Sequence, residues 1–397
     1  MYESSTNGVM LILERRISII FMLSAFDDIQ QNSGGEIRTS YIIEQAKIKG
    51  CKSVLVFKPS IFFNQGVLRK HFRMVKLLLP FVYFIAGLKS VQVHKQRFDL
   101  IYCGTCYPND TLGAYLLKLV TGTPVVCVSH DTPAQLEGYR FFRISEKQGR
   151  IVSLLSSAYG KLEILLIQKI DLAASISKFG RKYLEAITGT DKIIDSYNGI
   201  SKIWVEGTVE VESRKFDITY LGRIIARKNI NNLLEVVLKL TDDFPFIKFL
   251  IISNTPDERM KEVYDYVAKN FISKNVTIIK DATEEEKFSL LKQSKISINI
   301  SYDETFSIST LEAASCGNAL VLSDLSTFHD IYGDNAVYVD LNDPENIYMS
   351  VKELLSNRKI LQEFMEKALR TASNYLYSSV WDNELASFGR FLNGTKI

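Results

Sequence analysis

Short apolar runs alternate with longer, helix-like stretches along most of the chain, and this alternation limits the possible folds more than any other feature. In the first half, the runs with strand character are Ile17–Leu23, Ser53–Phe57, Asp99–Cys103, Pro124–Val128, Leu172–Ile176 and Lys192–Tyr197. Helical patterns lie between them, chiefly at Glu36–Lys49, Thr111–Val120, Ile151–Ile170 and Gly180–Ile187. Strands that alternate with helices are typical of parallel βαβ units. The first half therefore predicts an α/β domain with a parallel sheet.

A second round of the same alternation begins at Asp217. Its strands are predicted at Asp217–Leu221, Phe246–Ile252, Val276–Lys280, Ile296–Ile300 and Ala319–Leu322. Its helices are predicted at Asn229–Leu240, Asp257–Phe271, Glu284–Lys292 and Thr310–Cys316, and the tail from Pro344 to Leu392 predicts helices alone. The polar segment Ser201–Lys215 separates the rounds, so we expect two Rossmann-like domains, residues 1–205 and 206–378. In such sheets, ligands bind beyond the carboxyl ends of the strands.

Composition narrows the class of protein. A chain of 397 residues exceeds one ordinary core, while 46% hydrophobic and 23% charged residues are typical of a soluble globular protein. The net charge of +3 argues against a general binder of polyanions, so no nucleic-acid partner is expected. The longest apolar run, Met74–Leu88, contains Lys76 and Pro80 and is shorter than the ~20 residues that span a bilayer.

Five scattered cysteines, at positions 51, 103, 106, 127 and 316, predict no disulfide framework and favour the reducing cytoplasm. Cys103 and Cys106 have C-x-x-C spacing. No second pair of Cys or His lies nearby to complete a zinc site, so a strand end is the preferred interpretation.

The segment from Glu304 to Asp324 carries the clearest chemical signal. Glu304 precedes a turn of small residues and a predicted helix. The first amides of a helix lack internal partners and can bind phosphate, while carboxylates can accept hydrogen bonds from sugar hydroxyls. This combination indicates a nucleotide-sugar site. For the second carboxylate, Glu312, an alternative stays open, because Ser309 and Glu312 also have the spacing of a capping box.

Other candidate residues follow predicted strands. Gly34 and Gly35 lie at the first strand-to-helix crossing, where glycine amides can contact phosphate, although paired glycines also form ordinary turns. Arg223 and Lys228 follow the first strand of the second domain and suit a diphosphate, the alternative being a solvated basic loop. His130 follows a buried strand, where a structural role is about as well supported as a chemical one. No D-x-D triplet occurs, so a metal bound by paired aspartates is not expected.

These residues together resemble glycosyltransferase family 4, the retaining group 1 glycosyltransferases of GT-B fold. Glu304 and Glu312 match the E-x7-E motif of that family, and GRIIARKN matches its "GR…K" loop. Gly34-Gly35 matches its glycine loop, SYNGIS its turn before the linker, and YSSVWDN its final crossover helix. The resemblance covers nearly the whole chain. It implies two Rossmann-like domains that face each other across a cleft, with residues 379–397 as a helix that crosses back to the N-terminal domain.

The resemblance also implies a role for each matched position. Arg223 and Lys228 would stabilise the diphosphate leaving group. Glu304 would hold hydroxyls of the donor sugar, Glu312 would bind the ribose, and His130 would lie near the reacting carbon. Further contacts with the diphosphate would come from the glycine loop and from amides of the motif turn, namely Gly34, Gly35, Phe306, Ser307, Ile308 and Ser309. The family needs neither metal nor another cofactor, and it often has glycine where this chain has Thr305 and Ser307.

The segment Gly66–Arg97 contains seven Lys or Arg and no acid. Leu68, Phe72, Val75 and Leu79 share one helical face there, next to a basic face. An amphipathic basic helix of this kind can lie on an anionic membrane and would suit a lipid-linked acceptor. An ordinary domain helix with a basic outer face is the alternative.

We therefore expect a cytoplasmic glycosyltransferase of the hexosyltransferase type, with a membrane contact at the inner face as a further expectation. It would transfer a sugar from a UDP or GDP donor to a glycan or lipid-linked acceptor in surface polysaccharide synthesis. Two alternatives are a GT-B sugar-nucleotide epimerase and a non-catalytic subunit that binds sugar nucleotides.

Overall fold

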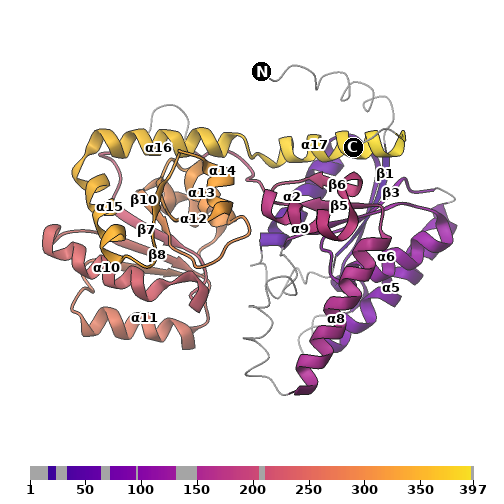
Figure 1. Cartoon of the computed structure of the whole chain (residues 1–397), viewed down its shortest axis with the longest axis horizontal. Coiled ribbons are helices and arrows are strands. Elements are labelled where there is room, and N and C mark those ends of the chain that lie inside the picture. Colours follow the sequence, from indigo (N-terminus) through magenta and orange to yellow (C-terminus); the bar gives the residue numbers. More distant parts are fainter. Residues whose placement is uncertain are drawn as a thin grey trace. The chain divides into compact units, whose positions relative to one another are not determined.

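The structure is a computed structural model that describes residues 17–23, 34–63, 72–94, 97–130, 150–204 and 211–394. The chain divides into two compact units (Figure 1). The first unit comprises Met1–Asn198 together with Tyr377–Ile397, and the second comprises Gly199–Leu376. The last helix of the chain therefore belongs to the same unit as the first strand.

The first unit is built on a parallel sheet of six strands in the order β2-β1-β3-β4-β5-β6. These strands are β1 (Ile17–Met22), β2 (Cys51–Phe57), β3 (Leu100–Cys103), β4 (Val125–Ser129), β5 (Leu172–Ser175) and β6 (Ile193–Asp195). Every residue of β1, β3, β4 and β5 is buried. Such continuous burial is typical of a parallel sheet whose two faces are both covered by helices. The carboxyl ends of these strands all lie along one edge of the sheet.

Seven α-helices of this unit, besides the short 3-10 turn η1 (Thr190–Lys192), fall within the described residues. They are α2 (Gly34–Ile48), α3 (Pro59–Phe62), α5 (Phe72–His94), α6 (Pro108–Thr121), α8 (Arg150–Lys169), α9 (Lys178–Thr188) and α17 (Tyr377–Leu392). Local sequence explains both ends of α6. Pro108 begins α6, where its missing amide hydrogen costs nothing, and Gly122 ends it at a φ of 72° that glycine adopts without strain.

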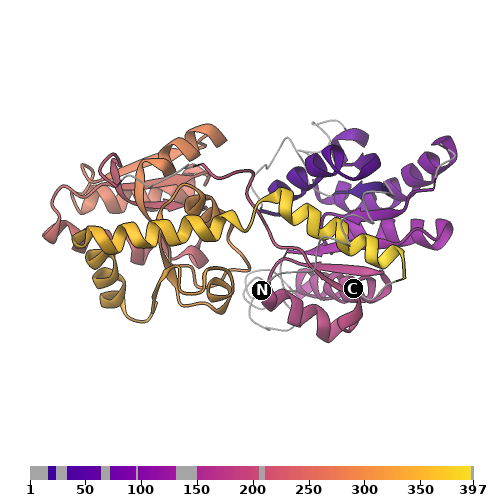
Figure 2. The same ribbon diagram turned by 90° about the horizontal axis from the view of Figure 1, so that it is seen from above.

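A buried charged cluster attaches α17 to the rest of the first unit. The helix packs against α2 and β6, and it is the yellow helix that ends near the label C in Figure 2. Arg38 of α2 and Glu384 of α17 form an ion pair in which both side chains are fully buried. Ser196 and Tyr102 also donate hydrogen bonds to the Glu384 carboxylate. Because a buried charge is costly without its partner, this cluster fixes the position of α17.

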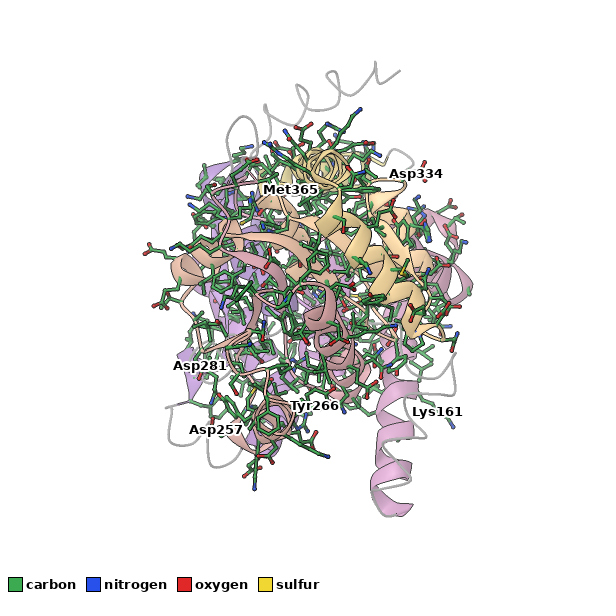
Figure 3. All side chains as sticks on the ribbon, turned by 90° about the vertical axis from the view of Figure 1, so that its left-hand side faces the viewer. Lys161, Asp257, Tyr266, Asp281, Asp334 and Met365 are labelled. Carbon is green, nitrogen blue, oxygen red and sulfur yellow. A yellow bond between two sulfur atoms is a disulfide. The ribbon has the colours of Figure 1, made fainter. Side chains whose placement is uncertain are left out.

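The second unit is a parallel sheet of six strands in the order β12-β11-β10-β7-β8-β9. The strands are β7 (Phe216–Leu221), β8 (Phe249–Ser253), β9 (Val276–Lys280), β10 (Ser294–Asn299), β11 (Ala319–Ser323) and β12 (Val337–Val339). The helices are α10 (Ile230–Asp243), α11 (Asp257–Lys269), α12 (Glu284–Lys292), α13 (Ile308–Ser315), α14 (Ser326–Tyr332), α15 (Pro344–Ser356) and α16 (Arg358–Ser373). Met365 of α16 is fully buried in the core of this unit, whereas Asp257 of α11 lies at its surface (Figure 3).

Most predicted elements are present, and the differences are local. The short elements β12 and α14 were not predicted, because three to seven residues give little periodicity. Helix α2 begins at Gly34 rather than Glu36, so both glycines lie in its first turn instead of a loop. Arg214, in the predicted linker, is buried and donates hydrogen bonds to the carbonyls of Ser294 and Cys316. That part of the linker therefore belongs to the second unit.

The expectation that the cysteines form no disulfide is wrong for one pair. Cys106 and Cys127 form a disulfide, with their Cα atoms 5.1 Å apart. Cys127 lies in β4 next to Cys103 of β3, and the chain after β3 turns back so that Cys106 reaches β4. This proximity depends on strand order, which the spacing of cysteines in the sequence does not reveal.

The predicted basic helix can be assessed only in part. Residues 72–94 form α5, but the side chains of residues 64–77 and 91–96, including Leu68, Phe72 and Val75, lie outside the described set. Within the described ranges, no helix is at once long and apolar enough to cross a bilayer.

Candidate functional site

The loop between β10 and α13 holds the first predicted carboxylate in a buried position. β10 ends at Asn299 and α13 begins at Ile308, so Glu304 lies midway between them, at the carboxyl edge of the second sheet. Glu304 is only 9% exposed. Phe306 anchors the loop, because its buried ring packs edge-on against Tyr375 with the ring centroids 5.8 Å apart. The loop is therefore a packed structure rather than a solvated connection.

Lys228 and Glu304, both predicted as site residues, form an ion pair. Lys228 ends the short helical turn η2 (Ala226–Lys228) that connects β7 to α10. The two side chains are 12% and 6% exposed. The same Glu304 oxygen also lies 3.1 Å from Ser301 Oγ and 3.3 Å from Asn299 Nδ2. The structure thus brings together a cation and a carboxylate that are far apart in the sequence.

Further contacts fix the basic loop against the carboxylate loop. The amide of Tyr302 donates to the carbonyl of Arg227 at 2.8 Å, and the Tyr302 hydroxyl donates to Asn229 at 3.1 Å. Arg227 lies 4.0 Å from Asp303 at the surface. Arg223 is exposed on the same loop, and the carbonyl of Arg223 accepts from the Tyr220 hydroxyl at 2.8 Å.

The electrostatics of Tyr220 place Glu304 and Arg223, one of the two predicted cations, near the same hydroxyl. Burial raises the pKa of Tyr220, the Glu304 carboxylate raises it further, and Arg223 and Arg227 oppose the shift. The guanidinium of Arg223 has no ion pair among the described residues. It is therefore available to an anionic ligand beside the Lys228–Glu304 pair.

The amino end of α13 completes this group. Ser307 is the residue before the helix and has φ 69° and ψ 82°, a left-handed conformation that favours glycine. Its hydroxyl does not cap the helix. The amides of the first turn, including those of Ile308 and Ser309, have no acceptor within the helix. This chain thus adopts with serine a backbone conformation that glycine adopts without strain.

Glu312 has a different partner from the one that the capping-box interpretation predicts. That interpretation is wrong, because α13 begins before Ser309 and Glu312 instead accepts from Lys287 of α12 at 2.6 Å. The Lys287 and Glu312 side chains are 17% and 10% exposed. Burial raises the pKa of Glu312, and the Lys287 ammonium opposes that shift. Glu312 is therefore held away from the helix start as a buried, singly paired carboxylate.

The remaining predicted residues belong to the first unit. Gly34 and Gly35 open α2, after β1. His130 follows β4, and its Nε2 lies 2.9 Å from the carbonyl oxygen of Gly104, in the loop after β3. The predicted site residues therefore form two groups, one at the carboxyl edge of each sheet.

The sequence interpretation missed three residues that contact the predicted carboxylates, one of which is Ser301, whose Oγ lies 3.1 Å from Glu304. Asn299 lies within hydrogen-bonding distance of Glu304, and Lys287 binds Glu312. A signal existed for Asn299, since a carboxamide between Ile298 and Ile300 of a predicted strand is expected to be buried and then needs partners. No comparable signal marked Lys287, which is one of several charged residues in α12.

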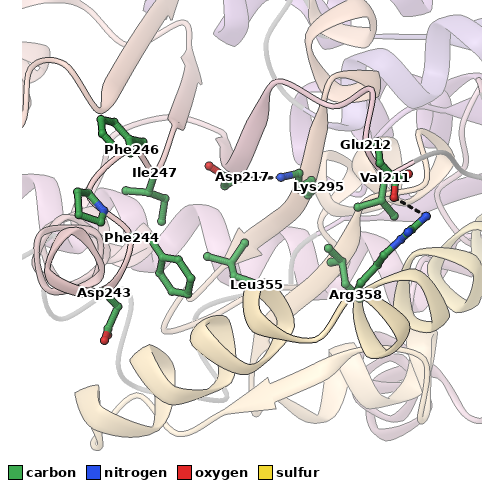
Figure 4. A pocket seen from close by; sticks show the side chains of 12 residues that line it. Val211, Glu212, Asp217, Asp243, Phe244, Phe246, Ile247, Lys295, Leu355 and Arg358 are labelled. Atoms are coloured by element: carbon green, nitrogen blue, oxygen red, sulfur yellow. Dashed lines mark hydrogen bonds and ion pairs between the residues drawn. The ribbon is translucent and has the colours of Figure 1, made fainter.

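A pocket of about 590 Å³ lies elsewhere, at the amino edge of the second sheet (Figure 4). None of the predicted site residues lines it. Its charged residues include Asp217, which pairs with Lys295 at 2.8 Å, and Glu212, which pairs with Arg358. Because these charges are already neutralised, the pocket offers less to a diphosphate than the loops around Glu304. No group of three His, Cys, Asp or Glu in the described ranges could hold a metal ion, and metal independence stays a prediction.

Comparison with known proteins agrees with this placement. Residues 208–371 match the family model of glycosyl transferases group 1, and this range contains the Arg223, Lys228, Glu304 and Glu312 positions. An uncharacterised glycosyltransferase of Methanocaldococcus jannaschii is 24% identical over 291 residues, which are 70% of this chain and 71% of that protein. The O-antigen chain mannosyltransferase RfbU of Salmonella typhimurium is 21% identical over 207 residues, covering 52% of this chain and 54% of RfbU.

Among solved structures, Anabaena HepE in complex with UDP and glucose matches with a TM-score of 0.67 at 13% identity, over 94% of this chain and 99% of HepE. The two six-stranded parallel sheets and this likeness establish the GT-B fold, with two Rossmann-like units. The chain is a glycosyltransferase whose residues 208–371 are similar to the glycosyl transferases of group 1.

Proposed function

We propose that this glycosyltransferase belongs to family 4 and transfers a sugar, with retention and without a metal, from a UDP or GDP donor to a glycan or lipid-linked acceptor. The observation that carries the proposal is the Lys228–Glu304 pair, which lies in the same loop cluster as Arg223 and the amino end of α13. Cations and free amides suit a diphosphate, and a carboxylate beside them suits the hydroxyls of the attached sugar.

The residues of the second unit divide the donor between them. Arg223 and Lys228 bind the diphosphate together with the first amides of α13, and they stabilise the negative charge that develops as it leaves. Glu304 then exchanges the Lys228 ammonium for sugar hydroxyls. Glu312, held by Lys287, accepts the ribose hydroxyls. The proposed roles of His130, Gly34 and Gly35 rest on the family resemblance.

The donor and acceptor classes are supported by the relatives. HepE was solved with UDP and glucose, which favours a UDP-sugar donor, and RfbU is described as an O-antigen chain mannosyltransferase, which favours synthesis of a surface polysaccharide. The cellular location stays a prediction. Sparse cysteines favour the cytoplasm, whereas the Cys106–Cys127 disulfide is of a kind that reducing compartments seldom keep.

Helix α5 supports a peripheral membrane contact. Leu78, Phe81 and Ile85 are 44%, 54% and 53% exposed and recur at the spacing of one helical face. Leu79 and Tyr83 of the same helix are fully buried. The exposed apolar stripe continues a segment rich in cations and free of acids, which suits an anionic lipid surface.

Vesicle sedimentation tests this contact. We expect vesicles with anionic lipid to retain the protein at low salt, and the double variant Phe81→Ser and Ile85→Ser to lose that retention. The matched control removes two exposed aromatic side chains from the second unit, Phe246→Ser and Phe271→Ser. Equal retention of the two double variants would remove α5 from the proposal.

Ligand-induced stabilisation tests the donor site. A ligand at 100 times its Kd stabilises a protein by about 2.7 kcal/mol, so UDP or GDP should raise the unfolding temperature measurably. We expect the shift to disappear in the double variant Arg223→Ala and Lys228→Ala. The control Lys239→Ala and Arg358→Ala removes the same number of cations from surface ion pairs of the same unit. A full shift in the site variant would contradict the assignment.

Radiolabelled nucleotide sugars then separate the possible activities. A transferase releases nucleoside diphosphate and moves the label to acceptor or water, an epimerase returns an isomerised nucleotide sugar, and a binding subunit leaves the donor intact. Only the first outcome agrees with the proposal.

A further inference from the structure

Asn299 occupies the centre of the loop that carries Glu304. It is the last residue of β10 and is 7% exposed, so its carboxamide is directed into the loop rather than to solvent. A carboxamide offers two N–H donors and one acceptor oxygen. In a buried position all three need partners, and the partners show what the residue holds together.

The contacts of Asn299 reach every part of the loop. Its Oδ1 accepts from the amide and the hydroxyl of Ser301, at 3.3 and 2.5 Å. Its Nδ2 donates to Ser307 Oγ and to Thr310 Oγ1, both at 2.9 Å, and lies 3.3 Å from Glu304 Oε1. The beginning, the middle and the end of the loop, and the first turn of α13, thus share one side chain.

The same contacts hold Ser307 in its left-handed conformation. Besides the bond from Asn299, Ser307 Oγ lies 2.8 Å from Thr310 Oγ1. This pair of contacts fixes the chain where it enters α13, and hence the direction of the first amides. Asn299 therefore acts on both the carboxylate and the helix end that the proposed function assigns to the sugar and the diphosphate.

The arrangement matters most when a donor binds. The Lys228 ammonium is the charged partner of Glu304 in the structure. A diphosphate competes for that ammonium, and the neutral groups nearest to Glu304 Oε1 are then Ser301 Oγ at 3.1 Å and Asn299 Nδ2 at 3.3 Å, whose hydrogens Glu304 shares with the closer partners inside the loop. A carboxylate with these two partners stays oriented while it accepts sugar hydroxyls.

We propose that Asn299 is a positioning residue that holds Glu304 and the amino end of α13 in one frame, and so couples recognition of the donor sugar to binding of its diphosphate. The inference rests on the proposed function for its ligand, and on the hydrogen bonds of the ligand-free chain for its mechanism.

The first test uses transfer or hydrolysis of a UDP-sugar. We expect Asn299→Leu, which has a similar size but no hydrogen-bonding groups, to lower kcat/KM by up to about 100-fold, because a small misplacement of binding groups costs that much. Asn299→Ser keeps one donor and one acceptor and should retain more activity. Added to Glu304→Gln, Asn299→Leu should lower kcat/KM by much less than it does alone.

The control is Asn275, a buried asparagine of the same unit whose Nδ2 donates to the carbonyls of Pro245 and Ile247 at 3.1 and 2.9 Å. Asn275→Leu removes comparable bonds from the amino edge of the sheet, so it should lower the unfolding temperature without changing kcat/KM. An equal loss of activity in the two Leu variants, or additive effects of Asn299→Leu and Glu304→Gln, would overturn the proposal.

A second test needs no ligand and separates this inference from the proposed function. In the ligand-free protein, the combined variant Asn299→Leu and Ser307→Ala should lower the unfolding temperature by less than the sum of the single changes, since both remove the same bond. Additive shifts would refute the role of Asn299 even in an active enzyme. If the effects of Asn299→Leu and Ser307→Ala on the unfolding temperature are less than additive but the protein acts on no nucleotide sugar, the proposed function is refuted instead.

Discussion

The backbone at Ser307 allows a test in which the usual order of alanine and glycine is reversed. With φ at 69° and ψ at 82°, Ser307 adopts a conformation that costs a residue with a Cβ atom about 1–2 kcal/mol. Ser307→Ala and Ser307→Gly both remove the hydroxyl, but only glycine also removes the Cβ atom. The difference between the two variants therefore isolates the backbone conformation.

The magnitudes follow from the contacts. Each variant loses the bonds of Ser307 Oγ with Asn299 at 2.9 Å and Thr310 at 2.8 Å, about 1 kcal/mol apiece. In Ser307→Ala the strained backbone remains, so the free energy of unfolding should fall by about 2 kcal/mol. In Ser307→Gly the relief of strain offsets part of that loss, although glycine gains about 0.5–1 kcal/mol of entropy in the unfolded chain. We expect the glycine variant to be more stable than the alanine variant by roughly 1 kcal/mol.

Urea unfolding followed by tryptophan fluorescence measures this difference. The chain has two tryptophans, so a common Trp381→Phe background leaves Trp204 as the reporter for the second unit. Ser289, exposed within α12, is the matched control. There the alanine variant should be more stable to unfolding than the glycine variant by about 1 kcal/mol, as in ordinary helices. If the Ser307→Ala variant is as stable as the Ser307→Gly variant, or more stable, the left-handed conformation of residue 307 is refuted.

Three further predictions concern ion pairs and the disulfide. Arg38→Met, which leaves the buried carboxylate of α17 without its charged partner, should destabilise the first unit by about 3–5 kcal/mol in urea unfolding. Lys49→Met, which removes an exposed ion pair between the same two helical segments, should cost less than about 1 kcal/mol, and equal losses would contradict the burial argument. Lys287→Met removes the cation that lowers the pKa of Glu312, so Glu312 should become protonated at a higher pH than in the parent chain. As the pH is lowered, the affinity for the donor should therefore begin to fall at a higher pH in the variant. Identical pH profiles of donor affinity in the two proteins would count against Glu312 as a donor ligand. Titration of thiols in denaturant should find three of the five before reduction and all five after it, whereas five at the outset would exclude the disulfide.

Local sequence was sufficient for much of the site on the second unit. Glu304, Lys228 and the start of α13 could be predicted because each is a short-range signal, a charged residue at a strand end or a helix start after a turn. The structure confirms that Lys228 and Glu304 meet. Glu312 shows the limit of such reasoning, because two local patterns fitted it equally, and the capping box was excluded only by the observed start of α13 and by the contact with Lys287 of α12.

The sequence by itself determined the class of fold, because apolar strands that alternate with helices can bury their faces only as parallel βαβ layers. It also determined which loops carry charge. The order of the strands, the disulfide, the burial of Arg38 with Glu384 and the network around Asn299 were decided by tertiary structure. Each of these depends on contacts between residues far apart in the chain, and a local pattern fixes the type of an element but not its neighbours.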